Sequence, residues 1–340
     1  MSLAFNGAVA VRELSGFDRM ALPAPVLQSD EPLVLRGLVR DWPLVRAGLD
    51  SAEAAADYLR GFYRGAPVVA MVAPAEVRGR FFYDAMLEGF NFQRVQARLD
   101  ELMGEMLRLR GQPGVPAIYV GATAADSCLP GWREANPIGL EAQQALASVW
   151  IGTPSRVSAH YDVPDNLACV AVGRRRFTLF PPEQLANLYV GPLDRTPAGQ
   201  AVSLVDFSAP DFERHPRFAR ALEQVRVVEL DPGDALFLPS LWWHHVEALS
   251  DFNVLVNYWW RGAGAMLESP NNALMLAMMS LRDLPPAQRR AWQEIFRHYV
   301  FESGDETIAH IPEAARGVLA PLDDAALQAL RAQLLSRLGR

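Results

Sequence analysis

The pattern of hydrophobic and polar positions divides the chain into three stretches. Residues 1–115 mix short apolar runs with segments of helical spacing, and residues 263–340 carry apolar residues at helical spacing. Between them, residues 116–262 consist of short apolar runs separated by Gly, Pro and Asp, which is typical of β-strands joined by turns. We therefore predict an N-terminal α/β elaboration packed on a β-rich core, followed by a C-terminal helical region.

Two strands and two helices are predicted in the N-terminal stretch. Asp50, followed three residues later by Glu53, resembles a capping box and predicts a helix over residues 54–62. Apolar residues at three- and four-residue spacing from Val95 onward predict a second helix that ends at Gly111. The strands are expected at residues 32–37 and 67–72.

The central stretch predicts a mainly β fold with helical additions. Its expected strands are residues 117–120, 148–151, 166–172, 176–180, 224–230, 235–238, 245–249 and 253–259. Because no long helix separates them, a double-sheet jelly roll or sandwich is favoured over a parallel sheet. Residues 188–221 are expected to form a loop and a short helix over the mouth of the barrel.

Three helices are predicted after the strands. The first two cover residues 272–281 and 286–301, and Asp323 is expected to cap the third. Four leucines of this last helix lie on one face: Leu327, Leu330, Leu334 and Leu338. Such a stripe packs either on the barrel of the same chain or against a second copy.

Composition narrows the classes of function. The 340 residues include 50% hydrophobic ones and carry a formal net charge of −7, so a large core is expected and general binding to nucleic acids or anionic membranes is not. The N-terminus lacks a signal-peptide pattern and no apolar run reaches membrane length. We expect a cytoplasmic protein in which Cys128 and Cys169 are buried and unpaired.

The sharpest chemical signal is a pair of histidine-bearing strand ends. His160 and Asp162 are two residues apart, so on a strand both side chains would project from the same face. A second histidine pair, His244 and His245, follows an apolar run 84 residues later (244 − 160), and strand alternation lets only one of the two point into the barrel. Two imidazoles and one carboxylate are the ligands of a facial triad that holds Fe(II) and leaves positions open.

Several motifs together resemble the cupin-like JmjC oxygenases. They are His160-Tyr161-Asp162, Asn166, the run Gly173-Arg174-Arg175-Arg176-Phe177-Thr178-Leu179-Phe180-Pro181-Pro182, and Pro239-Ser240-Leu241-Trp242-Trp243-His244-His245. The chain is most similar to the asparaginyl hydroxylase of that family that inhibits hypoxia-inducible factor, from about Pro32 to Trp260. The resemblance implies a double-stranded β-helix that binds Fe(II) and 2-oxoglutarate and uses O2 to hydroxylate a substrate. It also selects His244 as the third ligand.

The same resemblance implies a co-substrate site. Arg175 stands where the family has a lysine that binds the distal carboxylate of 2-oxoglutarate; the alternative is an arginine at a solvated strand edge. Tyr119 matches a tyrosine that donates to the same carboxylate, although a core tyrosine fits nearly as well. Asn166 and Asn257 align with pocket asparagines, and Trp259 with an aromatic residue beside the metal on the substrate side. One further position departs from the pattern, because a family hydroxyl residue is replaced here by Val157.

Three functions remain open at this point. The leading one is an Fe(II)- and 2-oxoglutarate-dependent dioxygenase that hydroxylates a protein or peptide side chain or a small molecule. A metal-dependent cupin enzyme that does without 2-oxoglutarate is the second, and a non-catalytic cupin-like binding protein is the third. Since the terminal helices of the resembling hydroxylase form a dimer, a homodimer through residues 263–340 is also expected, with no nucleic-acid or membrane partner.

Overall fold

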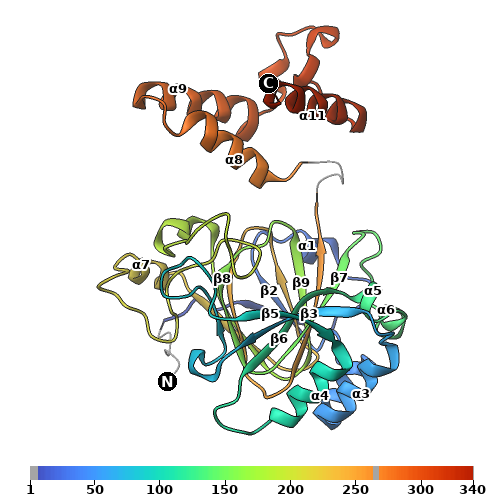
Figure 1. Ribbon diagram of the computed structural model, residues 1–340. Coiled ribbons are helices and arrows are strands. Elements are labelled where there is room, and N and C mark those ends of the chain that lie inside the picture. Colours follow the sequence, from blue (N-terminus) through green and yellow to red (C-terminus); the bar gives the residue numbers. More distant parts are fainter. Residues whose placement is uncertain (1–6, 263–267, 340) are drawn as a thin grey trace. The chain divides into compact units, whose positions relative to one another are not determined.

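The computed structural model describes residues 7–262 and 268–339, and Figure 1 shows the path of the chain through them. The chain divides into two compact units, Met1–Gly262 and Ala263–Arg340. This division falls where the strand-rich stretch was expected to give way to helices. The described residues do not include 1–6, 263–267 and 340, which lie at the ends of the predicted regions.

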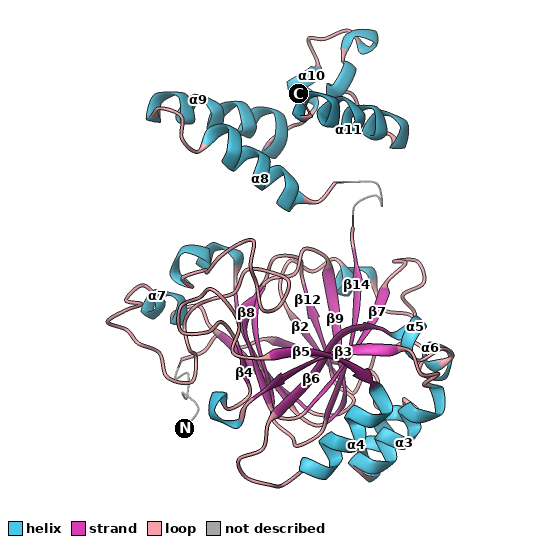
Figure 2. Cartoon of the chain, viewed as in Figure 1, coloured by secondary structure: helices cyan, strands magenta, loops and turns pink. Residues whose placement is uncertain are grey.

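The first unit contains two β-sheets (Figure 2). The nine-stranded sheet contains, in spatial order, β1 (Arg12–Ser15), β2 (Leu33–Arg36), β12 (Ala235–Leu238), β9 (Asp165–Val172), β14 (Asn253–Trp260), β7 (Leu146–Gly152), β6 (Ala117–Ala124), β3 (Pro67–Ala73) and β5 (Gln93–Arg98). The five-stranded sheet contains β11 (Arg226–Leu230), β10 (Arg175–Phe180), β13 (Trp243–Ala248), β8 (Ser155–His160) and β4 (Arg80–Phe81). The predicted class, a jelly roll with helical additions, is confirmed.

Alternation along β9 shows how the sheets are packed. Leu167, Cys169 and Ala171 belong to a core that also contains helical residues, whereas Ala168 and Val170 belong to a core shared with the five-stranded sheet. Both faces of this strand are therefore buried, which explains its nearly continuous apolar composition. Strand β14 alternates in the same way. The face turned to the second sheet is the one that can present side chains to the barrel interior.

Three helices cover the other face of the nine-stranded sheet: α2 (Pro43–Asp50), α3 (Ala52–Phe62) and α4 (Leu99–Leu109). Helix α2 approaches β9 so closely that a Cβ on Gly48 would lie 2.7 Å from the Val172 side chain. Strands β2, β3 and β5 of the N-terminal stretch join the nine-stranded sheet directly. This stretch thus packs on the barrel both as added strands and as a helical layer.

The N-terminal elements differ from the prediction at two helix starts. Helix α3 is capped by Ser51, whose hydroxyl accepts from the backbone N–H of Ala54 at 3.0 Å, while Asp50 is the last residue of α2. The expected capping box was therefore wrong by one residue, because a second helix ends immediately before α3. Val95 lies in β5, where it pairs with Ala70 of β3, so helix α4 begins only at Leu99.

Each of the eight predicted core strands overlaps an observed one, but β8 was not among them. The short elements of the first unit are α1 (Ala24–Leu27), η1 (Ala75–Val77), α5 (Ala125–Cys128), α6 (Trp132–Ala135), η2 (Pro182–Asn187) and α7 (Phe218–Leu222). Cys128 and Cys169 are buried and unpaired, as expected. Among the described helices, none combines the length and the apolar character needed to cross a membrane.

All regular structure in the described part of the second unit is helical. It contains α8 (Pro270–Leu281), α9 (Pro286–Phe296), the π-helical turn η3 (Arg297–Phe301), α10 (Asp305–Ile308), η4 (Glu313–Ala315), η5 (Gly317–Leu319) and α11 (Asp324–Leu338). Asp323 caps α11 as predicted, accepting from the backbone N–H of Ala326 at 2.8 Å. Within residues 268–339 only Thr307 is buried. This unit therefore has almost no core of its own within those residues.

Candidate metal centre

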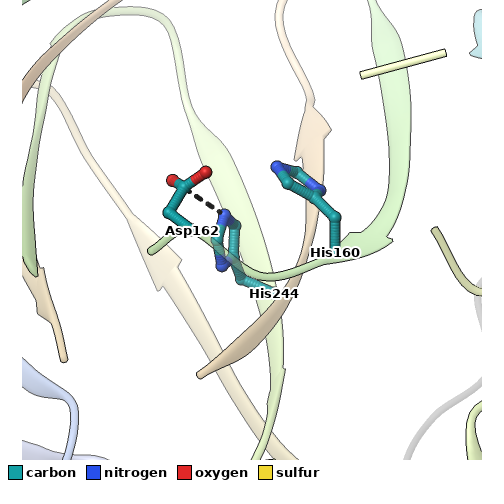
Figure 3. Close-up of side chains that lie close together, drawn as sticks. All are labelled: His160, Asp162 and His244. Carbon is teal, nitrogen blue, oxygen red and sulfur yellow. Dashed lines mark ion pairs between the residues drawn. The ribbon is translucent and has the colours of Figure 1, made fainter. Parts of the chain in front are cut away.

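His160 and His244 lie opposite each other on neighbouring strands of the five-stranded sheet. They are register partners in the β8–β13 pair, and their ring centroids are 4.3 Å apart (Figure 3). The Nδ1 of His160 lies 2.9 Å from the carbonyl oxygen of Ser158, and the Nδ1 of His244 lies 3.0 Å from that of Trp242. A proton on each Nδ1 would satisfy these carbonyls and leave both Nε2 atoms with a lone pair for a metal ion.

Asp162 completes the cluster from a loop. Its Oδ2 lies 3.7 Å from the Nε2 of His244, and one candidate ligand atom from each of the three residues lies within 4.8 Å of the others. We expected one strand to place both side chains on the same face. This was wrong, because strand β8 ends at His160 and Asp162 follows it. The loop after the strand, not strand alternation, brings this carboxylate to the two imidazoles.

His244 is held in the form that binds metals. Burial and the neighbouring His160 lower the pKa of His244 to about 4, and the opposing effect of Asp162 does not restore it. The imidazole is therefore neutral at neutral pH, as a metal ligand must be. His245 lies on the other face of β13, where its ring centroid is 4.9 Å from that of Phe207. It does not line the cavity that contains the other two histidines.

A cavity of about 450 Å³ is lined by His160, Asp162 and His244. All five of the other predicted site residues line it as well: Tyr119, Asn166, Arg175, Asn257 and Trp259. Residues 197–200 also line it, and they belong to the insertion that was expected over the mouth of the barrel. The base of this insertion is fixed beside the cluster, because the backbone N–H of Ser203 donates to the carbonyl oxygen of Ala159 at 2.7 Å.

Arg175 is the least compensated charge in the cavity. Its side chain is 2% exposed and makes no hydrogen bond or ion pair with any described residue, and its Nε is buried without an acceptor. Burial lowers the pKa of Arg175 to about 10, which still leaves it protonated at neutral pH. By contrast, Arg174 and Arg176 both form ion pairs with Glu229. The burial of Arg175 contradicts the alternative of a solvated strand edge, and an unpaired buried cation calls for an anionic ligand.

Tyr119 interacts electrostatically with both Arg175 and Asp162. Burial raises the pKa of Tyr119, with opposing effects from Arg175 and Asp162, so its hydroxyl remains a hydrogen-bond donor. Its ring also packs against Phe81 and Trp150, with centroid distances of 5.5 and 5.8 Å. The residue therefore belongs to an aromatic cluster and lines the cavity at the same time.

Two asparagines connect the nine-stranded sheet to the carboxylate. Asn257 donates from its amide to the Oδ1 of Asn166 at 2.8 Å, and Asn166 donates to the Oδ2 of Asp162 at 3.4 Å. The Oδ1 of Asn257 remains buried without a donor. Trp259, two residues further along β14, meets Trp150 edge to face at 5.9 Å, and both indole N–H groups lack acceptors among the described residues.

Sequence reasoning did not single out every residue of the site. Trp150 lines the cavity beside Tyr119, yet its position within an apolar strand looked like ordinary core. Arg94, on the edge strand β5, also lines it, and no strand was predicted at this position. Ser240 and Leu241 contact the loop that carries Asp162. A serine in a Pro-Ser turn was the one available signal for this contact.

The fold and this cavity define a cupin-like protein. The model of the family described as the cupin-like domain matches residues 21–266, so the chain belongs to that family. This assignment confirms the coarser part of the predicted resemblance. The finer likeness to the asparaginyl hydroxylase stays a prediction.

Curated relatives match a shorter segment. The chain is 36% identical over 127 residues to tRNA wybutosine-synthesizing protein 5 of Danio rerio, covering 37% of this chain and 36% of the relative. It is 34% identical over 129 residues to Lysine-specific demethylase JMJ31 of Arabidopsis thaliana, covering 37% and 23%. It is 33% identical over 132 residues to HSPB1-associated protein 1 of Homo sapiens, covering 38% and 26%. The matched segments thus span about a third or less of these relatives.

Proposed function

We propose that this protein is an Fe(II)- and 2-oxoglutarate-dependent oxygenase that hydroxylates a protein or peptide side chain or a small molecule. The donor set supports the metal. His160, Asp162 and His244 provide two imidazoles and one carboxylate in one cluster, which is the ligand set of non-haem Fe(II) oxygenases. Burial keeps His244 neutral, and a neutral imidazole is the form that binds a metal ion.

The unpaired Arg175 is the observation that supports the co-substrate. A guanidinium that is 2% exposed and has no acceptor among the described residues fits a carboxylate that arrives with a ligand. Tyr119 lines the same cavity and can donate a hydroxyl hydrogen bond to that carboxylate. Asn257 and Asn166, by contrast, are connected to Asp162 by a chain of hydrogen bonds. We assign Arg175 and Tyr119 to the distal carboxylate, and Asn166 and Asn257 to the end nearest the metal.

When bound, the metal and 2-oxoglutarate would supply the oxidising chemistry, consuming O2 and releasing succinate and CO2 as a substrate C–H group becomes C–OH. The residues of the chain have other tasks. Asn166 orients the carboxylate of Asp162, and the carbonyls of Ser158 and Trp242 orient the two imidazoles. Trp150 and Trp259 form an apolar wall that limits water in the cavity. We place Trp259 on the substrate side of the metal.

The lining of the cavity is compatible with more than one class of substrate. Residues 197–200, from the insertion, line the cavity with one polar side chain, that of Gln200, and Arg94 adds a cationic group to the lining. Two matched relatives are named for tRNA wybutosine synthesis and for lysine demethylation, so proteins similar to this chain are named for different substrates. The net charge of −7 makes a nucleic-acid partner unfavourable for this chain. We propose a cytoplasmic enzyme without a membrane partner.

A metal-dependent cupin enzyme that does not use 2-oxoglutarate is the second candidate. It is favoured by Val157, which lines the cavity and provides no hydroxyl group for a second carboxylate contact. A non-catalytic binding protein is less favoured, because the three potential ligands remain together.

Calorimetric titration separates the two enzymatic candidates. Protein loaded with Mn(II) under anaerobic conditions is titrated with 2-oxoglutarate, so that binding is measured without turnover. We expect saturable, metal-dependent binding that falls at least tenfold in Arg175→Gln and is retained in Arg174→Gln. Arg174 is a matched control, because it is the adjacent arginine and its partners, Glu229 and Asp231, lie outside the cavity. Absence of binding to the wild-type protein would favour the cupin enzyme without the co-substrate.

A further inference from the structure

The carboxylate ligand is carried by a segment that has no regular structure of its own. Strand β8 ends at His160 and β9 begins at Asp165, so residues 161–164 form the connection that presents Asp162. The two histidines, by contrast, lie within paired strands. A metal site is only as well ordered as its least constrained ligand, so the restraint on this connection matters for the whole cluster.

Two consecutive residues from a distant segment provide that restraint. The backbone N–H of Leu241 donates to the carbonyl oxygen of Asp162 at 2.9 Å, and the hydroxyl of Ser240 donates to that of Val163 at 2.6 Å. The backbone N–H of Ser240 donates to the Oδ1 of Asp165 at 2.9 Å. These bonds bracket the connection from its second residue to the first residue of β9.

The backbone at Leu241 is strained for a residue with a side chain. Its φ is +68°, in the left-handed region that favours glycine, and its side chain is 45% exposed. Core packing of the leucine therefore does not explain the conformation. This conformation directs the Leu241 N–H to the carbonyl oxygen of Asp162, so that the hydrogen bond between them forms.

The same segment leads directly into β13 and the other end of the cluster. Trp242 follows Leu241, its carbonyl lies against the Nδ1 of His244, and its indole N–H donates to the carbonyl of Asp30 at 2.9 Å. Residues 240–242 are thus anchored to the fold and contact both the backbone of the 161–164 connection and the imidazole of His244. A displacement of this segment would move the two ligands together.

We propose that Ser240 is a positioning residue for the metal ligand Asp162, and that residues 240–242 act as a clamp that couples Asp162 to His244. This inference rests on the proposed function only in requiring that the three residues bind a metal. It does not depend on the co-substrate. Loss of the Ser240 hydroxyl frees the connection while both imidazoles stay on their strands, so metal binding weakens without loss of the fold.

The test uses Co(II), whose visible absorption depends on its ligands. Metal-free wild-type protein and Ser240→Ala are titrated in competition with a chromophoric chelator. The matched control is Ser250→Ala, because the Ser250 hydroxyl accepts from the backbone N–H of Arg174 at 3.0 Å, in a turn outside the cavity lining. We expect the Co(II) affinity to fall about tenfold in Ser240→Ala and less than twofold in Ser250→Ala, within the range measured for residues that orient metal ligands.

Three further measurements distinguish positioning from general stabilisation. The Co(II) spectrum of Ser240→Ala should shift toward that of Asp162→Ala, and Ser240→Thr, which keeps a hydroxyl, should restore both spectrum and affinity. Leu241→Gly, which keeps the N–H and removes the strain, should retain wild-type affinity and unfold at the same or a higher temperature. Equal Co(II) affinity in wild-type protein, Ser240→Ala and Ser250→Ala would overturn the clamp while leaving the proposed function intact. A wild-type protein that binds no Co(II) would overturn both.

Discussion

His244 and His245 are neighbours in the sequence but lie on opposite faces of the five-stranded sheet. His244 pairs with His160 inside the cavity, whereas His245 packs against Phe207 on the other side. Both rings are buried, and burial is the main reason that the pKa falls to about 4 for His244 and to about 3 for His245. Only one of them has the neighbours of a metal ligand. The other is a neutral imidazole inside the fold.

From the lowered pKa values of these two histidines we predict how the free energy of unfolding of the metal-free protein depends on pH. Each folded-state pKa lies below the unfolded value of 6.5, so the unfolded chain binds more protons as the pH falls below that value. The free energy of unfolding should therefore decrease from about pH 6.5 toward pH 4, by up to about 1.4 kcal/mol per pH unit for each histidine. Urea unfolding at several pH values measures this slope.

The variant His245→Gln isolates one contribution. It removes one titrating group from the face opposite the cavity, so the slope below pH 6.5 should become shallower while Co(II) binding stays within about twofold of wild type. A slope unchanged from wild type would show that His245 is not held neutral by the fold.

Gly121 predicts a second effect, on the shape of the cavity. A Cβ at this position would lie 2.8 Å from the Trp150 ring and 3.2 Å from the Tyr119 ring. In Gly121→Ala at least one of these rings must therefore move. We expect 2-oxoglutarate affinity to fall about three- to tenfold, as for a misplaced binding contact, with altered tryptophan fluorescence. Gly61→Ala is the control, because nothing lies within 4 Å of the Cβ it would add. Unchanged affinity in Gly121→Ala would separate Trp150 and Tyr119 from the co-substrate site.

The helical unit leads to a prediction about assembly. Apart from Thr307, its described residues have no buried side chain, and Leu334, Leu335 and Leu338 of α11 are 40%, 62% and 56% exposed. We propose a homodimer in which the C-terminal helices of two copies cover these leucines. Light scattering should give twice the chain mass for wild type, and the monomer for Leu334→Glu combined with Leu338→Glu.

Leu49→Glu provides the control for this experiment. Leu49 is 65% exposed on α2, in the first unit, so the substitution adds the same kind of charge without changing a residue of the helical unit. It should leave the dimer intact. A monomeric wild-type protein at micromolar concentration would contradict the assembly proposal.

The sequence predicted which three residues lie together better than the way the fold brings them together. His160, Asp162 and His244 were identifiable because a histidine at the end of an apolar strand is costly unless it has a partner. Their spacing suggested one strand face for the first two, yet Asp162 lies in a loop restrained by Ser240 and Leu241. Such a restraint depends on contacts between segments about 80 residues apart, which local pattern does not encode.

Similar limits applied to the fold. Apolar runs located the strands of the barrel because both faces of strands such as β9 are buried. Val95 was assigned to a helix because a strand and a helix meet at Leu99 without a break in apolar spacing. The burial of Arg175 could not be read from three consecutive arginines, since only the register of β10 decides which of them points inward.

The most direct test of the central claim is anaerobic absorption spectroscopy of metal-free protein titrated with Fe(II) and then 2-oxoglutarate. A keto acid that chelates iron at His160, Asp162 and His244 should produce a visible charge-transfer band. The band should appear in wild type and His245→Ala and be absent in His244→Ala. If wild-type protein binds Fe(II) but develops no band, or if His244→Ala retains it, the assignment of this cavity as a 2-oxoglutarate-dependent iron site is contradicted.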